Sequence, residues 1–136
     1  GRGGEPYYCP RGWTRFGLNV GSQRKFDEMY GDWPIAYHGT KRGNVKDILA
    51  TAFRAGPDQS HMRAGRKGPA IVYLTPSIVY ASHERFAEWF DVDDDEKAQV
   101  VLQCRVKPGT YEKAGQTLGI HHRIDQNYHN SELEWL

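Results

Sequence analysis

The sequence predicts a mixed α+β domain built from short strands and short helices. Two apolar stretches of strand length, at 34–38 and 70–74, are each followed by a segment with the spacing of a helix. Two further strand-like stretches lie at 99–106 and 131–136. Strands that alternate with helices and are separated by Gly- and Pro-containing turns are typical of this class, and 136 residues suffice for one compact domain.

Residues 1–33 are expected to form an N-terminal extension that packs partly on the core. They are rich in Gly, Arg and Tyr, and the alternating stretch 13–20 predicts an edge strand. Residues 26–33 have the pattern of a short helical turn. The remainder, 34–136, is predicted to be the functional domain, and we expect the chain to be a domain of a larger protein.

A helix is predicted over 44–53, directly after the first strand, with Asn44 as its N-cap. Its apolar side chains recur at helical spacing: Val45, Ile48, Leu49 and Ala52. A basic loop, 54–67, leads to the second strand. A second helix is expected to begin at Ser77, and one of its sides carries Val79, Phe86 and Phe90.

The polar segments of the second half are predicted to be turns and loops. Residues 91–97 carry four Asp and one Glu and are expected to form a solvated turn. The loop 115–130 contains three histidines, His121, His122 and His129. Their spacing matches no common zinc-binding pattern, so we expect no metal there.

The composition argues against membrane and nucleic-acid partners. The formal net charge is +1, and no apolar run approaches the roughly 18–20 residues that a membrane span requires. Cys9 and Cys104 lie far apart, which favours free thiols in an intracellular protein over a disulfide. With no export signal in the sequence, we expect a cytoplasmic or nuclear location.

Polar and aromatic residues gather at the ends of the predicted strands. His38 and Gly39 close the first strand, and the glycine leaves its backbone N–H and C=O open to a ligand. Tyr73 lies in the second strand. Ser77 and Tyr80, three residues apart, share one face of the second helix.

A pair of carboxylates ends the sequence. Glu132 and Glu134 lie two apart on the last predicted strand, so both are expected on the same side. A planar aromatic amide needs a backbone donor–acceptor pair, a hydroxyl and an aromatic ring on which to stack, and the strand ends supply all three. A carboxylate opposite them is suited to stabilise a cationic sugar carbon or to orient a ribose hydroxyl as the amide leaves.

Taken in order, Tyr37-His38-Gly39-Thr40, Tyr73, Ser77-x-x-Tyr80 and a late strand Glu resemble the His-Tyr-Glu class of ADP-ribosyltransferases, the poly(ADP-ribose) polymerase-like group. The resemblance spans 34–136. It implies an ADP-ribosyltransferase-like catalytic domain with a split mixed β-sheet core and flanking short helices. It also implies an NAD-dependent transferase that adds single ADP-ribose units to a macromolecular acceptor and releases nicotinamide. The acceptor is expected to be a protein rather than a nucleic acid, with NAD as co-substrate and no metal.

The resemblance implies roles in NAD binding. His38, assisted by Thr40, would bind the adenosine ribose. The Gly39 backbone would bind the nicotinamide amide, with the Ser77 hydroxyl as a second donor. The basic loop 54–67 corresponds in position to the donor loop, and its arginines would meet the pyrophosphate.

Two aromatic and two acidic residues complete the implied site. Tyr73 and Tyr80 would stack on the nicotinamide ring from both sides, and Tyr73 and His38 are counted with the catalytic residues. Glu134 is favoured as the carboxylate that stabilises the ribose cation, with Glu132 serving the acceptor, but the opposite assignment stays open. The segment from Tyr73 to the second helix is shorter than in the polymerases.

Two other functions are compatible with the same motifs. One is a catalytically inactive module of the same fold that binds NAD, ADP-ribose or a protein, against which the retained His, Tyr and Glu argue. The other is transfer of a 2′-phosphate from RNA to NAD, which is disfavoured because the strands carry no ordered arginines.

Overall fold

The computed structural model describes residues 1–51 and 72–136, and within them it contains three helices, one 3-10 turn and six short strands. The helices are α1 (Gln23–Tyr30), α2 (Arg42–Thr51) and α3 (Ile78–Ala81), and the turn is η1 (Asn130–Glu132). The strands are β1 (Ile35–Gly39), β2 (Phe90–Asp91), β3 (Lys97–Ala98), β4 (Val101–Arg105), β5 (Lys113–Ala114) and β6 (Glu134–Trp135). The protein is therefore a small mixed α/β protein with short strands, which confirms the predicted class.

Every strand pairing between described residues is antiparallel. β1 pairs with β4 along its whole length, from Ile35 opposite Arg105 to Gly39 opposite Val101. β2 pairs with β3 in a hairpin, and β5 pairs with β6. The described ranges thus contain no parallel pairing of the kind that a mixed sheet requires.

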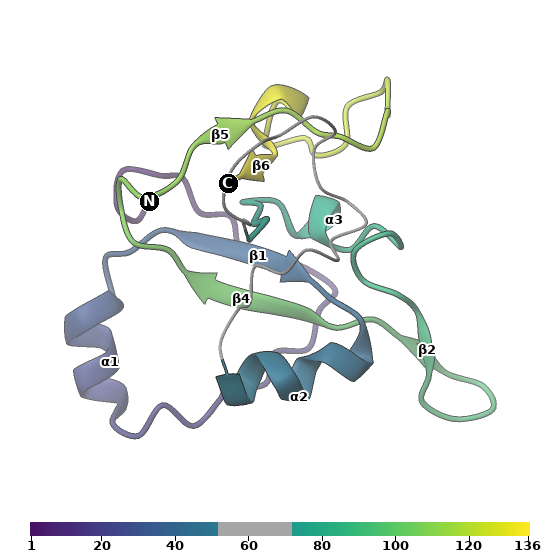
Figure 1. The fold of residues 1–136 in the computed structure, drawn as a ribbon, viewed down its shortest axis with the longest axis horizontal. Coiled ribbons are helices and arrows are strands. Elements are labelled where there is room, and N and C mark those ends of the chain that lie inside the picture. Colours follow the sequence, from purple (N-terminus) through teal and green to yellow (C-terminus); the bar gives the residue numbers. More distant parts are fainter. Residues whose placement is uncertain (52–71) are drawn as a thin grey trace.

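One pair of backbone hydrogen bonds joins β1 to the other half of the sheet. Tyr37 N–H donates to the Thr75 carbonyl over 2.7 Å, and Thr75 N–H donates back over 3.0 Å. Leu74 exchanges two further bonds, of 3.0 and 2.7 Å, with Trp135 of β6. The chain therefore forms one layer in the order β4, β1, residues 74–75, β6 and β5, which can be followed upward in Figure 1.

Apolar residues on both faces of β1 bury it in the middle of the fold. Ile35 and Tyr37 lie on one face and pack against Ala81 of α3. Ala36 lies on the opposite face and packs against Trp135 of β6. Successive side chains of a strand point to opposite faces, so apolar residues at consecutive positions mark a strand that is covered on both. The first predicted strand is confirmed with a shift of one residue.

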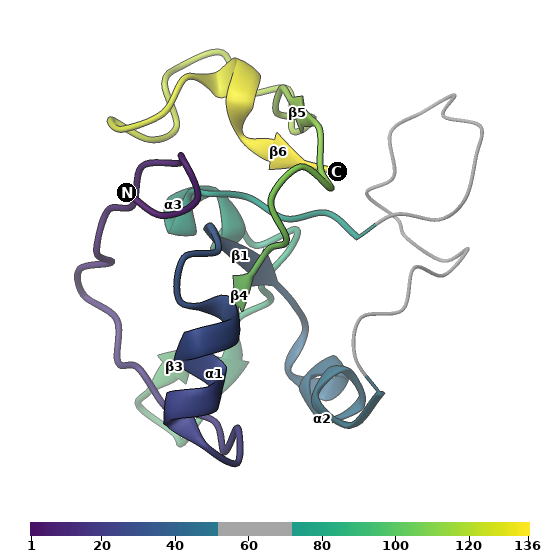
Figure 2. The ribbon, with the colours of Figure 1, turned by 90° about the vertical axis from the view of Figure 1, so that its left-hand side faces the viewer.

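α1 and α2 lie on the side of the β1–β4 pair that faces away from β5 and β6 (Figures 1 and 2). The helix predicted over 44–53 is confirmed as far as residue 51, and residues 52 and 53 lie outside the described ranges. It begins at Arg42, so Asn44 lies inside the first turn and is not the cap. None of the described helices is long and apolar enough to cross a membrane.

The helical turn predicted at 26–33 is a helix displaced toward the N-terminus. α1 begins at Gln23 because the Ser22 hydroxyl accepts a hydrogen bond of 3.3 Å from the Lys25 N–H, which satisfies a backbone donor that the helix itself leaves open. The N-cap at Ser22 therefore sets the start of the helix, and the apolar spacing over 26–33 does not.

Three predicted elements are wrong. The stretch 13–20 forms no strand, because no described strand lies against it, and its Phe16 side chain is 83% exposed. α3 ends at Ala81, so Phe90 lies in β2 and not on a helix face. The last strand has two residues in place of six, because 130–132 wind into η1.

Two further predicted segments lie wholly or partly outside the described residues. The basic loop 54–67 lies entirely outside the described residues. Of the strand predicted at 70–74, only residues 72–74 are described, and Leu74 forms a bridge with Trp135. The acidic segment 91–97 forms the β2–β3 hairpin and is exposed throughout, as predicted.

The first residues of the chain pack on the body of the fold. Glu5 accepts hydrogen bonds from the Tyr111 hydroxyl over 3.0 Å and from the Lys113 ammonium over 2.8 Å. The Tyr8 ring lies edge-on to the Tyr128 ring, with 5.5 Å between their centroids. These contacts attach the segment to β5 and to the loop before η1, while the boundary at residue 33 stays a prediction.

We expect Gly39→Ala to lower the free energy of unfolding by about 2–4 kcal/mol. A Cβ at this position would collide with the carbonyl oxygen of Ala81 and lie 2.8 Å from the Phe86 Cβ, because β1 passes directly against the end of α3. The matched control is Gly43→Ala in α2, where a Cβ meets open space, and it is expected to gain about 0.5–1 kcal/mol. Thermal and urea unfolding measure both; an unchanged midpoint for Gly39→Ala would contradict this packing.

Candidate functional site

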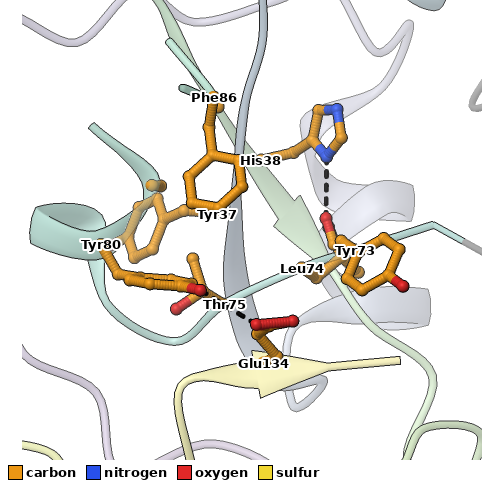
Figure 3. A pocket seen from close by; sticks show the side chains of 10 residues that line it. Tyr37, His38, Tyr73, Leu74, Thr75, Tyr80, Phe86 and Glu134 are labelled. Atoms are coloured by element: carbon orange, nitrogen blue, oxygen red, sulfur yellow. Dashed lines mark hydrogen bonds between the residues drawn. The ribbon is translucent and has the colours of Figure 1, made fainter. Parts of the chain in front are cut away.

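Ten residues line a hollow beside β1 that opens to solvent. They come from β1, from residues 73–75, from α3 and the turn after it, and from β6 (Figure 3). The lining residues are Tyr37, His38, Gly39, Tyr73, Leu74, Thr75, Tyr80, Ala81, Phe86 and Glu134. Five of these are predicted site residues: His38, Gly39, Tyr73, Tyr80 and Glu134. The fold therefore brings together most of the set that the sequence singles out.

Gly39 lies where the sheet separates beside the hollow. Val106 N–H donates to the Pro34 carbonyl over 3.0 Å, so alternate residues from Pro34 onward direct their backbone groups toward β4. The residues between them face the other edge, where Tyr37 pairs with Thr75. Gly39, two residues further on, directs its N–H and C=O to that same edge, and no described strand or bridge pairs with it there. A backbone donor and a backbone acceptor thus lie side by side at the hollow.

His38 is fixed across this separation by the backbone of Tyr73. Its Nδ1 lies 2.9 Å from the Tyr73 carbonyl oxygen, as Figure 3 shows. A carbonyl oxygen only accepts hydrogen bonds, so Nδ1 carries the proton of this bond. The imidazole is half-buried, and the bond sets its orientation at the rim of the hollow.

Glu134 is a buried carboxylate, 2% exposed, and its donors come from two distant segments. The Tyr80 hydroxyl donates to Oε2 over 2.9 Å (Figure 3), and the Thr117 hydroxyl donates to the same oxygen over 2.9 Å. The Thr117 N–H donates to the Tyr80 hydroxyl oxygen over 3.2 Å, which closes a three-membered network. Burial of a charge is costly unless hydrogen-bond donors surround it, and this network supplies them.

The same network changes the acidity of Tyr80. Burial raises the pKa of its hydroxyl to about 12; the N–H of Thr117 opposes this shift, and the Glu134 carboxylate adds to it. The Tyr80 ring also contacts the Phe86 ring, with 5.2 Å between centroids and an angle of 59° between planes. Tyr80 is therefore a neutral donor to Glu134 at physiological pH.

Ser77 is predicted to bind a ligand amide, but the structure gives it another role. It is the N-cap of α3, and its hydroxyl accepts the Tyr80 N–H over 3.0 Å. It donates its one proton to the buried Asp125 carboxylate over 2.6 Å. A hydroxyl has a single proton to give, so Ser77 has none left for a ligand while this bond is made.

Thr40 and Glu132 also lie outside the hollow. Thr40 is buried directly after β1 and is not among the lining residues. Glu132 is exposed in η1, while Glu134 is buried in β6. The two carboxylates therefore do not share a face, because the chain is not extended through residue 132. Glu132 lines a separate hollow beside Glu5 and β5.

The sequence does not predict two residues of the site, Thr117 and Phe86. Thr117 lies in a loop predicted only as polar, and no local pattern marks it as a partner of Glu134. Phe86 is predicted on a helix face, yet it lines the hollow from the turn after α3. A backbone donor–acceptor pair, aromatic rings and a carboxylate thus surround one hollow. Such a set can hold a flat ring that bears an amide, and it places a negative charge beside the atom to which that ring is attached.

The described ranges contain no group of three or more His, Cys, Asp or Glu side chains that could hold a metal ion. No protein-family model matches the chain, and no solved structure matches it. The resemblance to ADP-ribosyltransferases therefore depends on the ordered residues themselves and on where the fold puts them.

We expect Tyr80→Phe to flatten the loss of stability at alkaline pH. The pKa of Tyr80 is raised from 10.0 to about 12, so its stabilising contribution is complete below pH 10 and is lost as the pH rises through 12. At pH 12 this loss amounts to about 2 kcal/mol, and the Phe variant lacks it.

Unfolding by urea at pH 9 and pH 12 measures this difference. The pKa values of three other tyrosines are raised as well, those of Tyr37, Tyr111 and Tyr128, so part of the wild-type pH dependence remains in the variant. Identical pH dependence in wild type and Tyr80→Phe would show that the hydroxyl is not held as described.

Proposed function

We propose that this chain is an NAD-dependent ADP-ribosyltransferase that transfers a single ADP-ribose unit to a protein acceptor and releases nicotinamide. The observation that carries the proposal is the convergence of His38, Gly39, Tyr73, Tyr80 and Glu134 on one hollow. They come from four separate segments of the chain, β1, residue 73, α3 and β6, and nothing in their local sequence requires them to meet. Their meeting supports the reaction that the order of motifs implies.

The edge of β1 suits the nicotinamide amide. The N–H and C=O of Gly39 lie on the edge that no described strand occupies, and a carboxamide offers the complementary acceptor and donor. The rings of Tyr73 and Tyr80 line the same hollow and offer aromatic surface to the nicotinamide ring. His38, held by the Tyr73 carbonyl at the rim, is the residue to which we assign the adenosine ribose.

In the proposed reaction, the bond between the nicotinamide nitrogen and the ribose carbon breaks, and nicotinamide leaves with the bonding electron pair. Positive charge develops on the ribose carbon, and the Glu134 carboxylate stabilises it or orients the neighbouring hydroxyl. A nucleophile of the acceptor then forms the new bond to that carbon and releases its proton. The hydrogen bonds from Tyr80 and Thr117 fix the carboxylate before substrate arrives, so no reorganisation is needed at that moment.

Glu134, and not Glu132, is the carboxylate to which we assign this role. Glu134 lines the hollow and is buried, whereas Glu132 is exposed on η1 and lines a different hollow. A role for Glu132 toward the acceptor would therefore act from outside the hollow that holds nicotinamide.

We expect Glu134→Gln to reduce nicotinamide release by about 10²–10³-fold while NAD binding persists, because the amide keeps the shape and loses the charge. Release of free nicotinamide from NAD measures the rate, and NAD-dependent thermal stabilisation measures binding. Glu132→Gln is the matched control and is expected to retain wild-type release. Equal rates for Glu134→Gln and wild type would refute the assignment.

The same measurements separate the proposal from an inactive binding module. His38→Ala is expected to weaken NAD-dependent stabilisation in both cases, because His38 belongs to the binding site in both. Stabilisation of the wild type by NAD without nicotinamide release would favour the binding module. Neither release nor stabilisation would rule out both functions for this hollow.

A further inference from the structure

Thr117 contacts the two central groups of the site at once. Its hydroxyl lies 2.9 Å from Oε2 of Glu134 and 3.4 Å from Oε1, and its N–H donates to the Tyr80 hydroxyl oxygen over 3.2 Å. A threonine hydroxyl has one proton, so the shorter distance identifies Oε2 as its acceptor. Tyr80 donates to that oxygen as well, over 2.9 Å. Both donors are therefore gathered on one oxygen of the carboxylate.

Among the described residues, the other oxygen, Oε1, has only the longer contact, of 3.4 Å. A carboxylate oxygen accepts about two hydrogen bonds, so Oε1 retains capacity for a donor from a ligand. If Thr117 lost its hydroxyl, Oε2 would also be underused, and the carboxylate could turn about its last bond. The hydroxyl of Thr117 thus determines which oxygen of the Glu134 carboxylate is available to a ligand and how the carboxylate is oriented.

The loop around Thr117 is built to hold it in place. The side-chain oxygen of Gln116 accepts the Leu118 N–H over 2.9 Å and the Ile120 N–H over 3.3 Å, and its amide nitrogen donates to the Ile120 carbonyl over 2.9 Å. The Gln116 N–H also donates to the Asn130 carbonyl over 2.8 Å. The Gln116 side chain therefore closes the turn that follows Thr117, and the Gln116 backbone attaches this turn to the segment before β6.

We propose that Thr117 is a positioning residue for the Glu134 carboxylate. It holds Oε2 together with Tyr80 and leaves Oε1 for the ribose hydroxyl of the substrate. This inference rests on the proposed function, since the ribose hydroxyl belongs to NAD. Thr117 itself touches neither substrate nor reacting atom, because it does not line the hollow.

The test compares Thr117→Val, which keeps the shape and removes the hydroxyl, with Thr117→Ser, which keeps the hydroxyl. We expect Thr117→Val to lower kcat for nicotinamide release by about 10- to 100-fold with KM for NAD within about threefold, and Thr117→Ser to stay within about threefold of wild type in both. Thr110→Val is the matched control, because the Thr110 hydroxyl donates to the Lys107 carbonyl of an exposed turn and Thr110 does not line the hollow. It is expected to leave both constants unchanged.

A second arm does not depend on activity. The midpoints of thermal unfolding are measured for wild type, Thr117→Val, Glu134→Gln and the double variant. If the hydroxyl holds the carboxylate, the double variant loses less than the sum of the two single losses. Additive losses of the unfolding midpoint would overturn the inference, whatever the activity. A Thr117→Val variant with wild-type kcat would also overturn it, and so would equal losses of kcat in Thr117→Val and Thr117→Ser. Absence of release by wild type together with non-additive midpoints would refute the proposed function and keep Thr117 as the residue that holds Glu134.

Discussion

The exchange of two backbone hydrogen bonds between Tyr37 and Thr75 is the constraint on which the rest of the structure depends. It is the joint between the β4–β1 pair and the β6–β5 pair. Among the described residues, Tyr37 is the one residue of β1 that pairs with Thr75 at this joint. The edge of β1 beyond it therefore has no described partner strand, and Gly39 faces an opening there. The His38 side chain contacts the Tyr73 carbonyl at this point. The hollow therefore forms where the backbone pairing along this edge of β1 ends.

Stability and proposed chemistry use the same groups in this fold. Glu134 is 2% exposed and depends on donors from Tyr80 and Thr117, so the carboxylate is tolerated only when α3, the loop and β6 are all in place. Gly39 is constrained in the same way, because the close approach of the Ala81 carbonyl excludes any side chain. Substitutions at these positions disturb folding and function together, so activity losses have to be measured beside unfolding midpoints.

The parts of the fold that were predictable are those in which a local pattern and the final structure agree. The apolar run that ends at His38 specifies a buried strand by itself, and the helical spacing after it specifies α2. The site residues at strand ends follow from these elements, which is why five of the eight predicted residues line one hollow. Ser77 was placed correctly at the start of a helix, but its hydroxyl is used by Asp125, 48 residues away.

The errors arise where a distant contact outweighs a local pattern. Glu132 was assigned to a strand from its spacing to Glu134, yet the chain turns into η1 before β6 begins. Thr117 carries no local signal, because its partner lies 17 residues further along the chain. The stretch 13–20 has the alternation of an edge strand but no edge to join among the described residues. Spacing fixes which way a side chain points only after the backbone conformation is known.

The two buried carboxylates in the described ranges differ in how their hydrogen-bond donors are distributed over the two oxygens. Asp125 is bonded at both oxygens, by the Ser77 hydroxyl over 2.6 Å and by the Asn127 N–H over 2.8 Å, and it closes a turn. Glu134 has both of its short bonds on Oε2, and it lines a hollow. Each oxygen of Asp125 thus has a donor, whereas Oε1 of Glu134 has only the contact of 3.4 Å among the described residues. The unequal distribution leaves acceptor capacity on the residue that the proposed reaction requires to accept.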